Sequence, residues 1–332
     1  MDHDPAGMTH AGPVALVECT RGELVESEHR GSFCLADARG RVLLGAGPVD
    51  APVFPRSTLK PLQLAAMLRS GLELPEDLLA LGASSHSGAA VHRDGVRRIL
   101  ALHGHDETAL RNVAALPFGE PEREEWLRTG HGPVPVCQDC SGKHAAMVAT
   151  CVVNGWSVDD YVSLDHPLQR AIERTMTELT GEQPATVSVD GCGAPLFAVS
   201  LRGVATAYAR LATAAEGTAE GRVAAAMRRF PELVGGEGRD VTQLMRAVPG
   251  LVAKDGAEGV QALAVPNGTG VAIKIADGSD RARLPVALAV LESLGVDPAT
   301  LRTVPVPPVL GGGVPVGRLQ VPSSVRRLLD AG

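Results

Sequence analysis

The chain has 332 residues, of which 45% are hydrophobic and 21% are charged, and this composition is typical of a globular protein. It excludes a chain that is mainly disordered, because disorder requires few hydrophobic residues and a high net charge. The formal net charge of −7 and the lack of a Lys/Arg-rich run argue against nucleic-acid binding as the main function.

The first part of the chain predicts antiparallel strands followed by helices. Short apolar or β-branched segments occur at 13–19, 31–37 and 41–45, and a turn with Gly40 separates the last two. The spacing of Leu and Met then predicts a helix over 57–70. Further helices, separated by Gly and Pro, are expected at 76–82, 91–103, 119–129, 141–154, 166–180, 195–212, 218–230 and 238–247.

The pattern returns to strands near residue 250. The three strands are expected at 251–254, 259–265 and 270–276, a helix at 280–294, and a loop or edge strand in the Pro- and Gly-rich tail. This order predicts an α+β fold, in which both chain ends build one antiparallel sheet and a helical region is inserted between them. We expect a flexible N-terminus over 1–12 and one domain over 13–332, with a sheet lobe at about 13–56 and 250–332 and a helical lobe at about 57–249.

Lysine is scarce in this sequence. Only four of the 31 basic residues are lysines, namely Lys60, Lys143, Lys254 and Lys274. Arg stays protonated at any working pH, whereas the surroundings of a Lys can convert it into a neutral base. A lysine retained in an arginine-rich chain is therefore a candidate for chemistry that Arg cannot perform.

A serine and a lysine lie three residues apart where the first long helix is expected to begin. Ser57 and Lys60 would share one face of the opening turn, where Pro61 is tolerated. The positive end of the helix dipole favours an alkoxide on Ser57, and a Lys60 of lowered pKa could take its proton. The alternative interpretation is an N-cap serine beside a surface lysine, because a bare S-x-x-K pattern is common.

Two further segments carry polar residues in places that suggest a cleft. Ser85 lies in a run of four polar residues, 84–87, that follows an apolar stretch, although any one of these serines could simply cap a helix. Lys254 ends a strand and is followed closely by glycines, which would let an ammonium and a backbone N–H face one cleft. The alternative for Lys254 is an exposed position in a hairpin turn, and Lys274 is expected to point to solvent from a half-buried strand.

Six cysteines are present, and in a chain of this size they do not form a disulfide framework. Cys137 and Cys140 have a C-x-x-C spacing that suits a metal or a redox pair, and Lys143 follows in the same segment. One such pair supplies only two ligands, so Cys192, which lies in a Gly-rich turn after Asp190, could complete a metal site. The alternative is that the thiols are unrelated and buried, which is the commoner fate of Cys.

Taken together, these segments resemble a known pattern. S-x-x-K at a helix start, a serine loop and K-x-G on a late strand occur in this order in serine β-lactamases and penicillin-binding proteins, whose fold the serine-dependent glutaminases share. The complete set resembles the class 3 L-asparaginases, the rhizobial-type asparaginase II family, from about Cys19 to Asp277. The matching patterns are R-S-x-x-K-P, S-H-S-G, C-S-G-K-H, D-G-C-G-x-P and A-K-x-G-x-E-G.

The resemblance implies a fold like that of the serine β-lactamases and two Ser–Lys pairs. Ser57 matches the nucleophile and Lys60 its base. Ser85 matches the second serine and Lys254 the lysine paired with it. Position 87 is Ser where family members often carry Asn, so the resemblance assigns no role to Ser87.

The resemblance also implies a zinc ion. Cys140, Lys143 and Cys192 match its ligands, and Asp190, which is counted among the catalytic residues, lies beside them. Cys137 is the rival ligand because its spacing from Cys140 equals that of Lys143, but the resemblance covers C-S-G-K rather than C-x-x-C. A lysine that binds zinc must be neutral, so metal affinity is expected to fall at low pH.

We therefore expect an enzyme that hydrolyses L-asparagine to L-aspartate and ammonia through a Ser57 acyl-enzyme. The oxyanion would be held by the N–H of Ser57 and an N–H just after Lys254. A serine-dependent glutaminase, a β-lactamase-like hydrolase and a non-catalytic zinc-binding protein are the alternatives. The resemblance and the lack of a signal peptide or long apolar stretch predict a cytoplasmic homodimer with a small-molecule substrate and no nucleic-acid or membrane partner.

Overall fold

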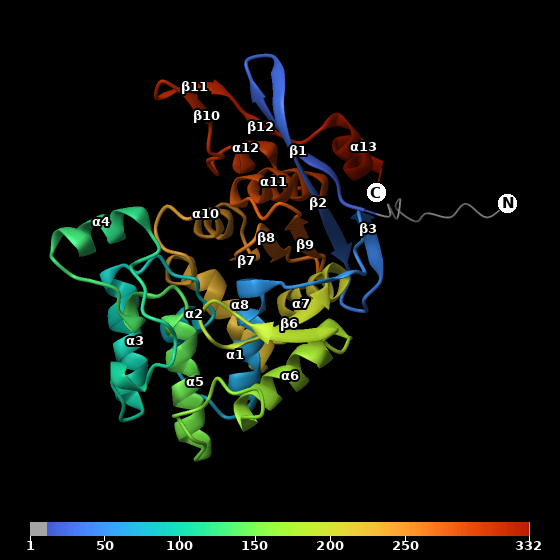
Figure 1. Ribbon diagram of the computed structural model, residues 1–332. Coiled ribbons are helices and arrows are strands. Elements are labelled where there is room, and N and C mark those ends of the chain that lie inside the picture. The colour runs from blue at the N-terminus through green and yellow to red at the C-terminus, as the bar shows by residue number, and fades with distance from the viewer. Residues whose placement is uncertain (1–11, 332) are drawn as a thin grey trace.

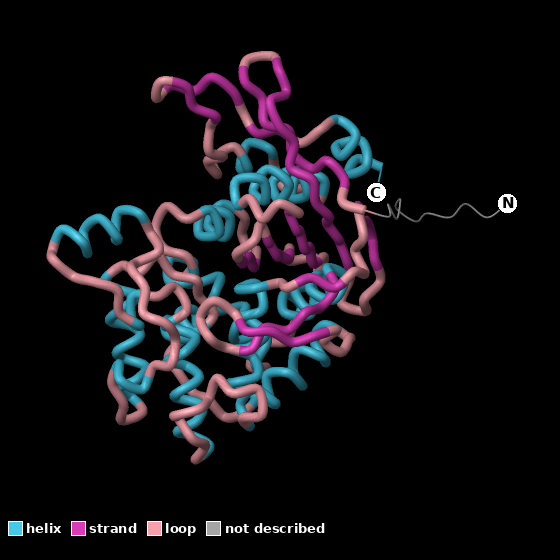
Figure 2. Tube along the Cα trace, in the orientation of Figure 1, coloured by secondary structure: helices cyan, strands magenta, loops and turns pink. Residues whose placement is uncertain are grey.

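The computed structural model describes residues 12–331, so the flexible N-terminus expected over 1–12 lies, except for its last residue, outside the described residues. Both chain ends contribute strands to one seven-stranded sheet of order β12-β1-β2-β9-β8-β7, with β3 paired to β2 (Figures 1 and 2). The α+β prediction is thereby confirmed. The strands are β1 (Val14–Arg21), β2 (Leu24–Ala36), β3 (Val42–Ala46), β7 (Val252–Gly256), β8 (Val260–Ala264), β9 (Gly270–Ile275) and β12 (Leu319–Gln320).

The register between the two chain ends is set by burial. β2 pairs antiparallel with β9, and Phe33 lies opposite Ile273, with neither side chain exposed. α7 (Leu201–Thr213) packs on one face of this sheet and α11 (Arg283–Ser293) on the other, as Figure 1 shows. The sheet is therefore covered on both faces, which explains why β7, β8 and most of β9 consist of buried residues.

A helical region lies between the two groups of strands and forms the lower half of Figure 1. Its helices are α1 (Lys60–Arg69), α2 (Glu76–Gly82), α3 (Ala90–Leu102), α4 (Glu120–Arg128), α5 (Ser141–Asn154), α6 (Pro167–Thr180), α7 (Leu201–Thr213), α8 (Ala219–Arg229), α9 (Pro231–Val234) and α10 (Asp240–Ala247), with 3₁₀ turns η1 (Arg56–Leu59), η2 (Glu107–Ala109) and η3 (Pro135–Cys137). A small sheet of order β4-β6-β5 is formed by β4 (Pro52–Val53), β6 (Pro195–Ser200) and β5 (Thr186–Val189).

The helix expected at 280–294 is present as the 3₁₀ turn η4 (Asp280–Ala282) and helix α11 (Arg283–Ser293). The tail that follows is more regular than the predicted loop, since it contains α12 (Pro298–Leu301), α13 (Ser323–Ala331) and the hairpin of β10 (Val309–Gly311) and β11 (Val314–Gly317). None of the helices formed by residues 12–331 combines the length and apolarity that a bilayer crossing needs.

Three local predictions are wrong. The helix expected over 195–212 begins only at Leu201, because 195–200 is the buried strand β6, and a short apolar run does not distinguish a buried strand from a helix. β2 begins at Leu24 rather than at residue 31. Its first five residues, 24–28, are exposed and include Glu26, Ser27 and Glu28, so they lack the apolar pattern from which the strand was predicted. Lys274 does not point to solvent: it is half-buried, and its ammonium donates to the carbonyls of Glu258 and Ile275.

Candidate active site

Three of the four lysines lie in the interior of the molecule. Lys60, Lys143 and Lys254 are 1%, 2% and 0% exposed and are among the largest fully buried side chains. Burying an ammonium group is costly unless it is paired and hydrogen-bonded, so each of these positions must be compensated by its surroundings. Three of the four lysines that the sequence singled out therefore have buried environments, which are unusual for this residue type.

Lys60, the first residue of α1, contacts residues 84–87, which we call the serine loop. Its ammonium donates to the hydroxyl of Ser85 at 2.8 Å and to the carbonyl of Ser84 at 2.6 Å, and it lies 3.7 Å from an Asp139 carboxylate oxygen. Burial lowers the pKa of Lys60, but Cys140 and Asp139 raise it by more, so the net shift is upward. Both hydrogen bonds of Lys60 go to the loop, so in this structure its partner is Ser85 rather than Ser57.

The serine loop is held from both sides. The N–H of Ser85 donates to the carbonyl of Val234 at 3.0 Å, and the N–H of His86 donates to the carbonyl of Asp139 at 3.1 Å. Ser87 donates to the Glu122 carboxylate at 2.7 Å, which ties the loop to α4. The loop is thus fixed by backbone and side-chain contacts where it meets Lys60.

Ser57 lies in η1, three residues before Lys60, and is half-buried. Its backbone N–H belongs to the first turn, where helical N–H groups have no acceptor within the helix. The end of β7 passes close by, since a Cβ placed on Gly256 would lie 3.3 Å from the Ser57 nitrogen. A glycine at this position therefore leaves room in front of the Ser57 N–H.

Arg56 and Asp190 meet beside Ser57. Arg56 has a φ of 54°, a left-handed conformation that is uncommon for a non-glycine residue and carries strain. Its guanidinium Nε donates to Asp190 Oδ1 at 2.8 Å, and the same oxygen accepts from the N–H of Gly191 at 2.9 Å. Asp190 thus contacts Arg56 directly rather than any of the lysines.

Lys254 is the middle residue of β7, so the strand continues past it instead of ending there as predicted, and it contacts Asp255. Its ammonium is 2.7 Å from Asp255 Oδ1 and 2.8 Å from the Asp255 carbonyl oxygen. Burial and the nearby charge of Lys60 lower the pKa of Lys254 to about 8, although the Asp255 carboxylate opposes this shift. The two lysines therefore share one region, but no direct bond joins Lys254 to Ser85 among the described residues.

The three proposed metal ligands come together. Cys140 and Cys192 pack against each other in a small cluster with Ala194, and Lys143 Nζ lies 3.2 Å from Cys192 Sγ. A hydrogen bond with Cys140 and the charge of Lys143 lower the pKa of Cys192 despite its burial, whereas the hydrogen bond with Cys192 and burial raise the pKa of Cys140. Burial lowers the pKa of Lys143, but the two sulfurs raise it by more.

The donor set fits a zinc ion. Two sulfurs and an amine converge, and the Nε2 atom of His144, the residue after Lys143, is buried without a hydrogen-bond partner in the described residues. Sulfur and nitrogen are the ligands that zinc prefers. Within residues 12–331 no group of three or more His, Cys, Asp or Glu is arranged for a metal, so a site here depends on Lys143. Cys137 packs in the main hydrophobic core instead.

A glycine explains how α5 reaches this position. A Cβ placed on Gly142 would lie 2.3 Å from the carbonyl oxygen of Leu81, at the end of α2. Only glycine permits this approach, which brings Cys140 and Lys143 up to the serine loop. Ser141 adds a contact, because its hydroxyl is 2.9 Å from His86 Nε2.

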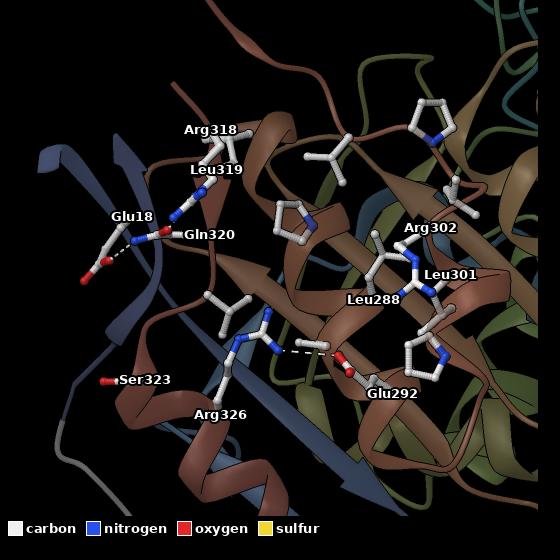
Figure 3. Close-up of a pocket in the computed structure, with 17 residues that line it drawn as sticks. Glu18, Leu288, Glu292, Leu301, Arg302, Arg318, Leu319, Gln320, Ser323 and Arg326 are labelled. Atoms are coloured by element: carbon white, nitrogen blue, oxygen red, sulfur yellow. Dashed lines mark hydrogen bonds and ion pairs between the residues drawn. The ribbon is translucent and has the colours of Figure 1, made fainter. Parts of the chain in front are cut away.

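A separate cavity of about 840 Å³ lies in the C-terminal part of the chain (Figure 3). It is lined by residues of α11, α12 and β12, among them Leu288, Leu301 and Gln320. None of its lining residues belongs to the lysine, serine or cysteine positions described above. The cavity is therefore distinct from the candidate active site.

Sequence reasoning missed several members of the site. Asp139 lies inside the C-x-x-C segment and Asp255 directly follows Lys254, so their positions beside chemically suspect residues were the available signals. Arg239 carries no such signal, because it reaches Asp255 from a segment 16 residues earlier in the chain.

Comparison with known proteins gives one family match. The L-asparaginase II family model matches residues 17–321, whereas no curated protein matches the chain significantly. Among solved structures, a β-lactamase from Mycobacterium bovis is 15% identical with a TM-score of 0.46, over 80% of this chain and 95% of its own. Mglu in its native form is 18% identical with a TM-score of 0.43, over 87% and 67%. EstCE1, a hydrolase with promiscuous acyltransferase activity, is 17% identical with a TM-score of 0.38, over 74% and 88%.

The family match spans nearly the whole described chain and contains every segment on which the resemblance was based. The resemblance is thereby confirmed. The chain belongs to the L-asparaginase II family, a family of amidohydrolases.

Proposed function

We propose that the chain hydrolyses L-asparagine to L-aspartate and ammonia through an acyl-enzyme on Ser57. One observation carries the proposal beyond family membership: a half-exposed serine lies within three residues of a buried lysine that is bonded to a second serine. Such a grouping of nucleophile, base and relay suits acyl transfer.

The chemistry follows from the position of Ser57. Its hydroxyl oxygen attacks the side-chain amide carbon of the substrate, and the proton passes to the lysine system. The N–H groups of Ser57 and of the residues after Lys254 stabilise the oxyanion. The amide nitrogen leaves as ammonia after taking up a proton, and a water molecule then cleaves the Ser57 ester to release aspartate.

The two lysines divide the proton transfers. Lys60 is bonded to Ser85, while Lys254 has the pKa nearest to neutrality, at about 8. A general base works best when its pKa lies close to the working pH. We place Lys60 as the base that removes the proton of Ser57, and Ser85 and Lys254 as the groups that relay protons and, with a water molecule, complete hydrolysis.

The Arg56–Asp190 pair is the proposed binding site for the amino-acid part of the substrate. Arg56 uses Nε for Asp190, which leaves its other nitrogens to bind an α-carboxylate. Asp190 supplies the negative charge that an α-ammonium group requires. A zwitterionic ligand thus matches this pair better than an uncharged amide does.

A zinc ion held by Cys140, Lys143 and Cys192 is also part of the proposal. When bound, it would supply a fixed positive centre that orients the substrate and shapes the pocket. Its binding must release the proton of Lys143, because only the neutral amine donates an electron pair. A cytoplasmic homodimer completes the proposal, and sedimentation analysis of the purified chain tests the dimer.

The experiment compares ammonia release from asparagine and from glutamine, with cleavage of a chromogenic cephalosporin as a third arm. We expect asparagine to give the highest kcat/KM. A higher kcat/KM for glutamine or for the cephalosporin would contradict the proposal that asparagine is the preferred substrate. Intact-mass spectrometry after reaction with an acylating asparagine analogue should show one adduct, which the Ser57→Ala variant lacks.

A further inference from the structure

A chain of charged groups continues behind Lys254. Asp255 Oδ1 lies 2.7 Å from the Lys254 ammonium, and Asp255 Oδ2 lies 2.6 Å from Arg239 Nη2. The side chains of Lys254, Asp255 and Arg239 are only 0%, 8% and 16% exposed. One carboxylate thus bridges two cations in the interior, using a different oxygen for each.

Arg239 is itself held in place. It directly precedes α10, and its guanidinium carbon lies 4.4 Å from the centre of the Phe118 ring, within the range of a cation–π interaction. Behind it, Arg283 of α11 is 2.7 Å from Asp240 Oδ2 and also 2.7 Å from Gln261 Oε1. These contacts connect β7, β8, α10 and α11 around Asp255.

We propose that Asp255 and Arg239 are positioning residues for Lys254: Arg239 fixes the orientation of the Asp255 carboxylate, and Asp255 holds the Lys254 ammonium in the site. Lys254 has four rotatable side-chain bonds, and among the described residues its ammonium bonds only to the carboxylate and the carbonyl oxygen of Asp255. Because Arg239 fixes the Oδ2 atom of this carboxylate, the Oδ1 atom is held where it bonds the ammonium. The catalytic meaning of this arrangement rests on the proposed function, whereas the arrangement itself does not.

The charges in this region predict the direction in which the pKa of Lys254 changes when Asp255 is replaced. Asp255 raises the pKa of Lys254, whereas burial and the charges of Lys60 and Arg239 lower it. Removing the Asp255 charge should therefore lower the pKa of Lys254 further below about 8. The titratable and charged groups that face the Lys254–Asp255 pair are Lys60 of α1, Arg239, Arg283 of α11 and Tyr208 of α7.

The test uses the small number of lysines. Because the chain has only four, the full-length protein labelled with ε-¹³C-lysine gives four signals, and the Lys254→Arg variant identifies one of them. We expect the titration midpoint of Lys254 to fall by at least about one pH unit in Asp255→Asn, a tenfold change in its protonation equilibrium. Asp255→Glu keeps the negative charge, so the Lys254 midpoint should stay close to its wild-type value in this variant. Arg246→Gln, which breaks an exposed ion pair between α10 and Glu237, should leave the midpoint unchanged.

The activity arm uses the same variants with asparagine. We expect kcat to fall about tenfold or more in Asp255→Asn and in Arg239→Ala, while KM changes less than about threefold because neither side chain is placed against the substrate. The pH dependence of kcat/KM in Asp255→Asn should shift in the same direction as the Lys254 signal. A purely structural role would lower the amount of folded enzyme without moving this profile.

The outcomes are separable. An unchanged Lys254 midpoint in folded Asp255→Asn overturns the proposal, even if asparaginase activity is found. If both Asp255 variants fail to fold, Arg239→Ala decides: wild-type kcat and an unmoved Lys254 midpoint overturn the proposal, and loss of kcat with a moved midpoint supports it. If the wild-type enzyme releases no ammonia from asparagine, the proposed function fails, and the Lys254 titration still tests the positioning.

Discussion

Gly142→Ala tests whether the close approach of α5 to α2 builds the active site. The new Cβ would lie 2.3 Å from the Leu81 carbonyl oxygen, whereas ordinary contact begins at 3.4 Å, so α5 must move by about 1 Å. This movement displaces Cys140 and Lys143, which flank position 142. A misplacement of about 1 Å in an active site can reduce the rate by about 100-fold.

The expected result is a kcat/KM for asparagine that is about 100-fold lower and a stability that is about 1–3 kcal/mol lower, because extra atoms in a packed interior are accommodated with strain. Ammonia release and thermal unfolding measure the two effects. Gly132→Ala is the matched control, since a Cβ at Gly132 meets nothing within 4 Å and should change neither quantity. If Gly142→Ala keeps kcat/KM within about threefold of wild type, the α5 position does not set the site geometry.

Five further variants test the assigned roles. Ser57→Ala should lower kcat at least about 10³-fold, and an active variant would remove Ser57 as the nucleophile. Its stability should change by less than about 1 kcal/mol in thermal unfolding, because the N-cap of η1 is Pro55 and no side chain caps this turn. Lys60→Arg should be nearly inactive because Arg cannot accept a proton, whereas Lys274→Arg should remain close to wild type in the same ammonia assay because Lys274 only donates to carbonyls. Metal analysis should show zinc lost in Cys192→Ser and retained in Cys137→Ser, and the reverse result would show that the wrong cysteines were joined.

The sequence predicted the architecture because hydrophobic patterns change along the chain. Strands at both ends and helices between them followed from periodicity, and the sheet confirms that prediction. Pro195–Ser200 was wrongly predicted as helix because every position of this strand is buried, so no alternation between faces marks it. This segment forms a strand because both of its faces are buried in the folded protein, and a single sequence does not show that burial.

The parts of the site that contain a residue type rare in this chain could be predicted, whereas the parts that consist of common residue types could not. Lys60 and Lys254 could be singled out because lysine is rare in this chain. Arg239 could not, because it is one of 27 arginines and its role arises from an ion pair formed across the fold. The Lys60–Ser85 contact likewise depends on how two distant segments pack, which spacing along the chain does not determine.

The three buried lysines show how one residue type acquires different chemistry from its partners. The pairs are Lys60–Asp139, Lys143–Cys192 and Lys254–Asp255. The net pKa shift is upward for the first two lysines, and it is downward for Lys254 because burial and a neighbouring ammonium outweigh its carboxylate. Only Lys254 thus comes close to releasing its proton near neutral pH. An arginine there would keep the charge and the hydrogen bonds but could never lose the proton, which gives a physical reason for lysine to persist at this position in an arginine-rich chain.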